Sequence, residues 1–184
     1  MQTERLMLRP FSPDDADFIL AVLNDRDFMR FVGDRQVRSI EHAKAYLQTG
    51  PIASYARHGF GLYAVELKAA HEPVGMCGLL QRASLPDPDI GFAFLPAWRA
   101  QGLALEAAQA VLAEARDRWS LARVLAIVDP ANERSIGLLR ALGMTFLDLR
   151  PDDRNGGELA CYSIEFPARK ETGGVQRPHA EDLR

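Results

Sequence analysis

The spacing of apolar residues changes abruptly between positions 90 and 119, and this change constrains the fold more than any other feature of the chain. An apolar run from Ile90 to Leu95 ends at Pro96, which is typical of a buried strand. From Gly102 to Arg118 the apolar period is about 3.6 residues, which predicts a helix. The apolar face of this helix consists of Ala104, Ala108, Val111, Ala115 and Trp119. The chain is therefore expected to pass from a buried strand into a long helix through one short turn.

That turn contains Arg99 and Gly102 and has the properties of an anion site. The backbone N–H groups that open a helix lack internal partners, and the helix dipole adds partial positive charge there. Gly102 lets the backbone approach a ligand closely, and Arg99 could add a charge-assisted contact. These features suit a pyrophosphate group. The alternative is a plain strand–turn–helix joint in which Gly102 serves only the turn. The Gly-x-Gly-x-x-Gly and Walker patterns are absent from the chain.

The remaining periodicities predict a mixed α+β domain. Strands are expected over residues 3–9, 60–67, 73–81, 90–95, 124–128, 144–149 and 159–166. Helices are expected from Ser12 onward and over residues 39–47, 102–118 and 132–142, with Gly50-Pro51 breaking the chain after the second of them. This order predicts a single domain with a twisted mixed sheet of about seven strands flanked by about four helices. Residues 1–166 form the expected domain, and residues 167–184 form a polar C-terminal tail.

Composition argues against several classes of protein. A formal net charge of −3 over 184 residues creates no field that would recruit nucleic acid. No apolar stretch approaches ~18 residues, so no membrane association through a spanning helix is expected. Two cysteines are too few for a disulfide scaffold, and the N-terminus lacks the apolar run of a signal peptide, so a cytoplasmic location is the simplest interpretation. The four histidines lie far apart, without metal-ligand spacing.

Three segments resemble motifs of the GNAT superfamily of N-acyltransferases. Arg99-Ala-Gln-Gly102-Leu-Ala104 is similar to the superfamily signature Arg/Gln-x-x-Gly-x-Gly/Ala. Asn132-Glu-Arg-Ser135, followed by Leu138-Leu139-Arg-Ala-Leu-Gly143, resembles the second motif. The opening Thr3-Glu-Arg-Leu-Met-Leu-Arg-Pro10 resembles the first strand of the ribosomal-protein N-terminal acetyltransferase (RimJ/RimL-like) branch. The resemblance covers residues 3–166 and implies the acyl-CoA N-acyltransferase fold.

The resemblance also implies acetyl-CoA as the co-substrate, with no metal. Backbone groups of Phe92 to Phe94 would pair with the pantetheine arm at a splay in the sheet, and amides from Ala100 to Ala104 would hold the pyrophosphate. Asn132 would hydrogen-bond the pantetheine; the alternative is an ordinary helix N-cap. The implied cofactor-binding residues are Phe92, Ala93, Phe94, Arg99, Ala100, Gln101, Gly102, Leu103, Ala104 and Asn132.

In this superfamily the amine attacks the thioester directly, so the protein needs no nucleophile of its own. A backbone N–H near Phe94 could polarise the carbonyl. Many relatives protonate the departing thiolate with a tyrosine four residues beyond the Ser135 position, but this chain has Leu139 there. By its position, Ser135 is the candidate that would protonate the thiolate in place of the tyrosine, through a water molecule. The alternative is that Ser135 is an ordinary residue in the first turn of the helix. Neither Cys77 nor Cys161 is needed, and their apolar strands predict core positions.

Asp89 is the preferred candidate for the general base, because it opens the motif strand where relatives often carry a glutamate. Other carboxylates on predicted strands remain open as the base, namely Glu66, Asp148 and Glu158. For each of them the alternative is a solvated carboxylate at an edge of the sheet. A chain of water molecules could also carry the proton.

The expected activity is acetyl transfer to a primary amine. The opening segment favours the α-amine of a protein or peptide N-terminus, and small-molecule amines remain open. The resemblance also implies that the segment from Phe28 to His58 walls the acceptor site, with the candidates Arg30, Phe31, Tyr46, Tyr55 and Arg57. The alternative is a packed cover with solvated arginines. The main alternative is a non-catalytic acyl-CoA-binding sensor or interaction module. A nucleic-acid-binding module is disfavoured because no basic stripe is present, and the oligomeric state stays open.

Overall fold

The computed structural model describes residues 1–152 and 156–167. Except for residue 167, the predicted polar tail lies outside the described residues. In the part of the chain that is described, no helix is long and apolar enough to cross a membrane.

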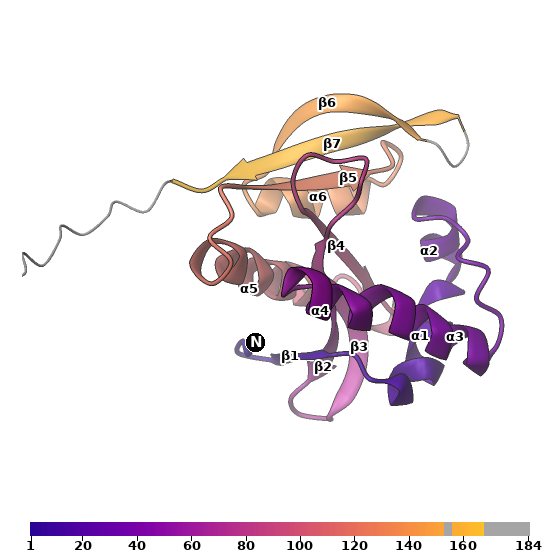
Figure 1. The fold of residues 1–184 in the computed structure, drawn as a ribbon. Helices are drawn as coiled ribbons and strands as arrows, with labels where there is room; N and C mark the ends of the chain where they lie inside the picture. Colours follow the sequence, from indigo (N-terminus) through magenta and orange to yellow (C-terminus); the bar gives the residue numbers. More distant parts are fainter. Residues whose placement is uncertain (153–155, 168–184) are drawn as a thin grey trace, which may run out of the picture.

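Seven strands of the described chain form one twisted mixed sheet in the order β1-β2-β3-β4-β5-β7-β6 (Figure 1). The strands are β1 (Leu6–Pro10), β2 (Leu62–Leu67), β3 (Glu72–Leu80), β4 (Asp89–Phe94), β5 (Arg123–Val128), β6 (Thr145–Asp152) and β7 (Gly157–Glu165). All neighbouring strands pair antiparallel except β4 and β5, which are parallel. The predicted α+β class and the number of strands are confirmed.

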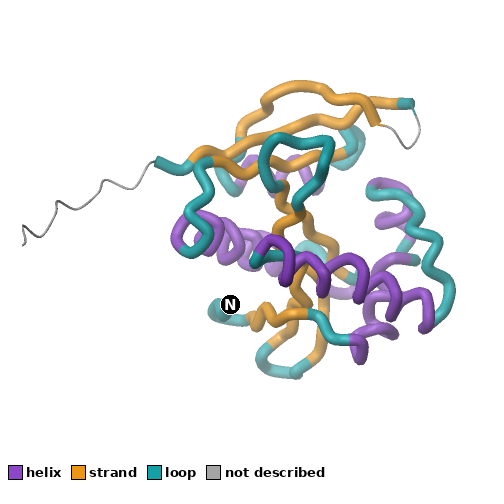
Figure 2. Tube along the Cα trace, in the orientation of Figure 1, coloured by secondary structure: helices purple, strands orange, loops and turns teal. Residues whose placement is uncertain are grey.

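Helices cover both faces of this sheet (Figure 2). They are α1 (Ala16–Leu23), α2 (Arg26–Phe31), α3 (Ile40–Leu47), α4 (Ala53–His58), α5 (Leu103–Asp117) and α6 (Glu133–Ala141). Successive side chains of a strand point to opposite faces, and β2 divides its residues accordingly. Tyr63 and Val65 pack in the core that contains the apolar face of α5, whereas Leu62 and Ala64 pack in the core formed with α1 and α3.

The segment after α3 differs from the prediction, because Gly50-Pro51 does not break the chain. A π-helical turn over Gln48–Ile52 joins α3 to α4 without interruption. Proline supplies no backbone N–H, and the wider π-helical turn accommodates this missing donor inside a helix. The short helix α2 was not predicted, because its six residues are too few to show a helical period. Counting α3–α4 as one, five helical segments flank the sheet within the described residues.

The parallel strands β4 and β5 diverge almost as soon as they meet. Their only register pair in the described structure is Asp89 with Leu125, at the first residue of β4. By contrast, β4 pairs with β3 along its whole length, from Asp89 to Phe94. The sheet is therefore open on one side of β4 beyond Asp89, as the predicted splay requires.

Candidate functional site

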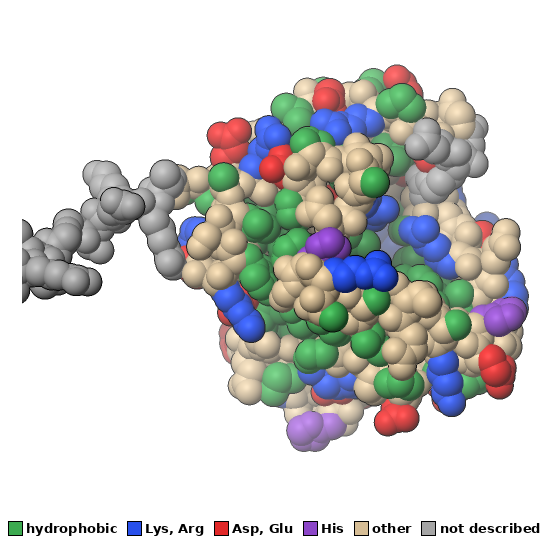
Figure 3. All heavy atoms as spheres, in the orientation of Figure 1, with side chains coloured by type: hydrophobic (Ala, Val, Ile, Leu, Met, Phe, Trp, Pro, Cys, Tyr) green, Lys and Arg blue, Asp and Glu red, His purple; other side chains and the backbone are tan. Residues whose placement is uncertain are grey.

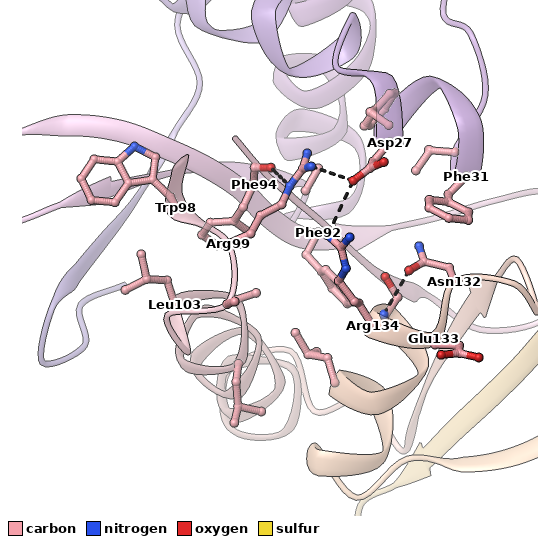
Figure 4. Close-up of a pocket in the computed structure, with 18 of the residues that line it drawn as sticks. Asp27, Phe31, Phe92, Phe94, Trp98, Arg99, Leu103, Asn132, Glu133 and Arg134 are labelled. Carbon is pink, nitrogen blue, oxygen red and sulfur yellow. Dashed lines mark hydrogen bonds and ion pairs between the residues drawn. The ribbon is translucent and has the colours of Figure 1, made fainter. Parts of the chain in front are cut away.

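A pocket of about 620 Å³ lies at this splay and is bordered by α2, the β4–α5 turn and the start of α6 (Figure 4). We call it the larger pocket. The predicted cofactor-binding residues that line it are Phe92, Ala93, Phe94, Arg99, Ala100, Gly102, Leu103, Ala104 and Asn132. Ser135 also lines it, whereas Gln101 does not. The structure thus brings nearly all of these residues to one cavity, and their roles as ligands of the cofactor stay predictions.

The backbone of β4 offers hydrogen-bonding groups to the larger pocket. Leu95 donates its N–H to the Val74 carbonyl of β3 at 3.0 Å, an ordinary distance for such a hydrogen bond. Along an antiparallel pair the backbone groups of successive residues point alternately toward and away from the partner strand. Phe92 and Phe94 therefore direct their N–H and C=O groups away from β3, into the splay. Of the predicted trio, Ala93 is the residue whose backbone groups face β3.

The β4–α5 turn lines the larger pocket and has an unusual backbone conformation. Ala100 has φ +58° and Gly102 has φ +77°, so both residues lie in the left-handed region. Arg5 donates from Nη1 to the Gln101 carbonyl at 3.0 Å. In a trans peptide the N–H points opposite to the C=O, so the Gly102 N–H faces away from Arg5. The turn also precedes α5, a 15-residue helix whose first N–H groups have no intrahelical partner.

The N-terminal segment fixes this turn through Glu106, in the first turn of α5. Glu106 accepts hydrogen bonds from the Thr3 hydroxyl at 2.5 Å and from the Arg5 backbone N–H at 2.8 Å. Arg5 Nε completes the contact with Glu106 Oε2 at 2.7 Å. The opening residues that resemble one branch of the superfamily therefore also brace the predicted pyrophosphate turn. Gln101 itself is exposed, and its side chain donates to the Ala97 carbonyl.

Arg99 is engaged by protein groups that the sequence did not reveal. Its guanidinium forms ion pairs with Asp25, the N-cap of α2, and with Asp27 at 2.8 Å, while its Nε donates to the Phe94 carbonyl at 2.8 Å. Asp27 also lies 3.6 Å from Arg134 of α6 (Figure 4). Arg99 thus ties α2 to the β4–α5 turn, and a contact with phosphate would have to share or replace these partners.

A second cavity of about 120 Å³, the smaller pocket, adjoins the larger one. The two pockets share Phe28, Phe31, Val32, Phe92, Asn132 and Ser135 among their lining residues. The polar residues found only in the smaller pocket are Arg35, Tyr46, Arg82, Asp89 and Asp129. A molecule in each pocket would meet the other at the shared residues.

Asn132 and Ser135 stand at this junction, at the start of α6. Asn132 is the N-cap, and its Oδ1 accepts from the Ser135 backbone N–H at 3.2 Å. This leaves the Asn132 Nδ2 group and the Ser135 hydroxyl without a hydrogen-bond partner among the described residues. Both are half-buried and line both pockets, so both can contact bound molecules. Leu139, in place of the usual tyrosine, is buried one turn further along α6.

Asp89 lies in the smaller pocket and is almost completely buried, with 1% of its surface exposed. Both of its carboxylate oxygens accept from Arg82 Nε, at 2.9 and 3.0 Å. Burial raises the pKa of Asp89 above its ordinary value, against the opposing effect of the Arg82 charge. Among the carboxylates considered from the sequence, it is the one that lines a pocket. Glu66 is paired with Arg9, Asp148 is paired with Arg150, and Glu158 is exposed on β7.

Sequence reasoning missed three charged residues of the smaller pocket, namely Arg35, Arg82 and Asp129. Asp129 directly follows β5, and its position immediately after a buried β-branched strand was a signal that could have identified it. The two arginines lie in connections, after α2 and after β3, where no periodic pattern places a side chain. Of the five candidates for the wall of the acceptor site, three line the pockets, namely Arg30, Phe31 and Tyr46.

The other two candidates, Tyr55 and Arg57, line neither pocket. The Tyr55 hydroxyl accepts from the Phe11 N–H at 3.1 Å and donates to the Leu62 carbonyl, so it joins α4 to the sheet. Cys77 and Cys161 are buried free thiols outside both pockets. Within residues 1–152 and 156–167, no group of three or more His, Cys, Asp or Glu side chains could hold a metal ion.

Comparison with known proteins identifies the family. A model of the acetyltransferase (GNAT) domain matches residues 5–145. The uncharacterized N-acetyltransferase YoaA of Bacillus subtilis is 28% identical over 144 residues, which cover 78% of this chain and 81% of that protein. The GNAT-family acetyltransferase structure from Bacillus anthracis is 22% identical, with a TM-score of 0.76 over 90% of this chain and 97% of that one.

RimL, the ribosomal L7/L12 α-N-protein acetyltransferase, has also been solved in complex with coenzyme A. It is 20% identical, with a TM-score of 0.76 over 89% of this chain and 95% of that one. At 20–22% sequence identity, these two structural matches support the fold alone. The family model, in contrast, spans most of the chain and includes the splay, the β4–α5 turn and the start of α6. This chain therefore belongs to the GNAT acetyltransferase family and is an N-acetyltransferase.

Proposed function

We propose that this acetyltransferase transfers the acetyl group of acetyl-CoA to the α-amine of a protein or peptide N-terminus, by direct attack in a ternary complex. The observation that carries the proposal is the junction of two pockets at Phe92, Asn132 and Ser135. Acetyl-CoA in the larger pocket and an amine in the smaller one would meet there without a covalent enzyme intermediate. The absence of a cysteine from both linings favours direct transfer.

The larger pocket fits coenzyme A in the chemistry of its lining. The left-handed turn and the first N–H groups of α5 would hold the pyrophosphate, and Gln101 would contribute only through its backbone. Backbone groups of Phe92 and Phe94, together with the Asn132 amide, would pair with the pantetheine arm. When bound, acetyl-CoA supplies the activated acetyl group. Arg99 acts in this proposal by positioning the turn against α2.

The chain supplies polarisation and two proton transfers. The N–H of Phe92 faces the splay beside both pockets, and it would donate to the carbonyl oxygen as negative charge develops there. The Ser135 hydroxyl would give its proton to the departing sulfur, directly or through one water molecule, and regain a proton from the attacking nitrogen, which must lose a second one as the amide forms. Asp89 would accept the proton of the incoming ammonium. Asp89 lies three residues before Phe92, or about 10 Å along the strand, so water must relay this proton.

The support for a protein or peptide acceptor comes from two features. The opening segment that resembles the ribosomal-protein branch is built into the turn through Thr3 and Arg5. RimL, whose name states that it acts on the α-amine of a ribosomal protein, is among the solved structures with the same fold. The cytoplasmic location belongs to the same proposal, and the two unpaired thiols support it.

Thiol release from acetyl-CoA across a panel of amines tests the proposal. The panel contains peptides with free N-termini, amino acids, polyamines and aminoglycosides, and calorimetric titration with coenzyme A runs beside it. We expect coenzyme A to bind and the peptides to release thiol fastest. If a small-molecule amine released thiol fastest, the proposed acceptor would be that amine instead of a peptide N-terminus. Tight binding of coenzyme A with no release from any acceptor would favour a non-catalytic sensor, and no binding would remove the role assigned to the β4–α5 turn.

The pH dependence of the reaction tests the assignment of Asp89. A general base must be deprotonated, so the rate rises as the pH rises through its pKa. Because burial raises the pKa of Asp89, the rising limb of the pH–rate profile is expected above the ordinary carboxyl pKa of 3.8. Replacement by asparagine is expected to remove this pH dependence and to lower kcat/KM by about tenfold, which is less than the roughly 10²–10⁴-fold of direct general acid–base contacts because water relays the proton. Asp148→Asn changes a strand carboxylate outside both pockets and serves as the matched control, which should keep the pH dependence. Loss of the pH dependence in Asp129→Asn instead would assign the base to Asp129.

A further inference from the structure

The smaller pocket has two ends of opposite charge. One end, beside Ser135 and the junction with the larger pocket, carries the carboxylate of Asp129. Its Oδ1 accepts from the Ala131 N–H at 2.8 Å, and no ion pair engages it among the described residues. The other end is formed by Arg35, Tyr46 and Arg82, which come from the α2–α3 connection, α3 and the β3–β4 connection. Asp89 is paired with Arg82 at this end, so Arg35 supplies its uncompensated positive charge. An amine in position to react would have its ammonium group beside Asp129.

The basic end has hydrogen-bond donors that the protein does not use. Arg82 donates to Asp89 through Nε alone, and both of its terminal nitrogens lack hydrogen-bond partners among the described residues. Arg35 is exposed and makes no hydrogen bond or ion pair within the same residues. In contrast, Arg38 on the same connection is neutralised by Asp34 at 2.5 Å. The basic end therefore presents guanidinium donors that are suited to a planar anion such as a carboxylate.

Tyr46 adds a neutral donor to the same lining as the two arginines. Burial raises the pKa of its phenol, so the hydroxyl keeps its proton. The phenol makes no hydrogen bond to the described residues and is therefore free to donate. Figure 3 shows a hollow between the β6–β7 hairpin and the helices α2 to α4, with basic side chains around its rim. Because Arg35 is exposed, the basic end is within reach of solutes.

The volume of the pocket limits what it can hold. Its 120 Å³ is about one fifth of the 620 Å³ of the larger pocket. It therefore suits a small group rather than a long chain. The apolar part of the lining, including Leu62, Met76 and Ile90, gives the intervening atoms of such a group a nonpolar surface.

From this arrangement we infer that the acceptor carries a carboxylate a few bonds from its reactive amine, and that Arg35, Tyr46 and Arg82 bind it. The inference rests on the proposed function, because it assigns the substrate class of the same site. A carboxylate of this kind has two sources: the side chain of an acidic first residue in a peptide, or the free α-carboxylate of an amino acid. Both present the same group to the basic end.

Matched pairs of acceptors test the inference. One pair is a peptide amide that begins with glutamate and the same peptide beginning with glutamine; the other is alanine and alaninamide. In at least one pair, we expect kcat/KM to be about tenfold higher for the carboxylate-bearing member, the size of one charge-assisted hydrogen bond. The pair that shows the preference identifies the source. Equal rates within both pairs would overturn the inference.

Variants connect the preference to the residues. Arg35→Gln and Tyr46→Phe are expected to reduce the preference several-fold, by raising KM for the carboxylate acceptor alone. Arg57→Gln is the matched control, because Arg57 is an exposed arginine of α4 that lines neither pocket. A preference that survives both substitutions would contradict the assignment.

Calorimetric titration of the same acceptors onto the protein loaded with coenzyme A measures the preference without turnover. Failure of the proposed function and failure of the inference therefore give different results. If no acceptor releases thiol, the proposed function falls, while tighter binding of the carboxylate members would still support the inference. If peptides are acetylated but the members of each pair bind and react equally, the proposed function stands and the inference falls.

Discussion

Replacement of Ser135 by alanine is expected to lower kcat by about 10²-fold, the usual size of a general acid–base contribution. The hydroxyl lines both pockets and makes no hydrogen bond to the described residues, so removing it leaves no broken protein contact. The N-cap contact uses the backbone N–H of Ser135, which alanine retains. The dissociation constant of coenzyme A should therefore stay within about twofold, and the loss should fall on turnover. Single-turnover rates and calorimetric titration measure the two quantities.

Two further variants make this result specific. Ser135→Thr keeps a hydroxyl and should retain more of the turnover rate than the alanine variant. Gly137→Ala changes the same helix two residues further on, at an exposed position where an added Cβ meets nothing within 4 Å. It should leave kcat unchanged. An unaltered kcat in Ser135→Ala would remove Ser135 from the mechanism and leave the protonation of the thiolate to solvent.

Replacement of Gly75 by alanine is expected to destabilise the protein by about 2 kcal/mol, as overpacking of a core does. A Cβ at this position would lie 2.5 Å from Cδ1 of Phe94 and 2.8 Å from the Ala93 carbonyl oxygen. Gly75 and Phe94 are register partners on β3 and β4, and the new Cβ would also lie 2.6 Å from Cγ of Phe94, an atom that turning the ring does not move. Relief of the contact therefore requires a shift of β4, which borders the splay. We therefore expect weaker binding of coenzyme A as well as a lower Tm. Thermal unfolding with and without coenzyme A measures both effects.

A second substitution separates the steric cause from a general loss of folding. Phe94→Ala removes the Cγ and Cδ1 atoms that the new Cβ meets, so the double variant should lose less stability than the sum of the two single variants. Gly137→Ala again provides the control, and here it should be neutral or stabilising by up to ~1 kcal/mol, because alanine favours a helix more than glycine does. Additive losses in the double variant would show that contact with the Phe94 ring is not the source of the destabilisation.

These experiments also address the alternative of a non-catalytic acyl-CoA binder. Leu139 occupies the position at which many relatives carry a tyrosine, and its hydrocarbon side chain has no acidic proton to supply. The enzyme assignment follows from the family, and the two-pocket junction provides a place for Ser135 to take over this role. A loss of turnover in Ser135→Ala with coenzyme A binding intact would support that replacement directly.

The sequence by itself determined the order of elements and the position of the central turn. Continuous apolar runs and a switch to helical period reflect local burial, and local burial is readable from neighbouring residues. The strand at 90–95, the turn and the helix at 102–118 were therefore predicted within one residue of β4 and α5. Asn132 was likewise predicted as an N-cap, because capping depends on residues only three positions apart.

Tertiary structure alone decided which side chains meet. The partners of Arg99 are Asp25 and Asp27, more than 70 positions earlier in the chain, and no local pattern could pair them. The charged lining of the smaller pocket depends in the same way on connections that converge from separate elements. The helix through Gly50-Pro51 was missed because Pro51 is buried in a continuous helical segment, and this packing overrides the local tendency to break. Periodicity records whether a residue is buried, whereas the site depends on what it is buried against.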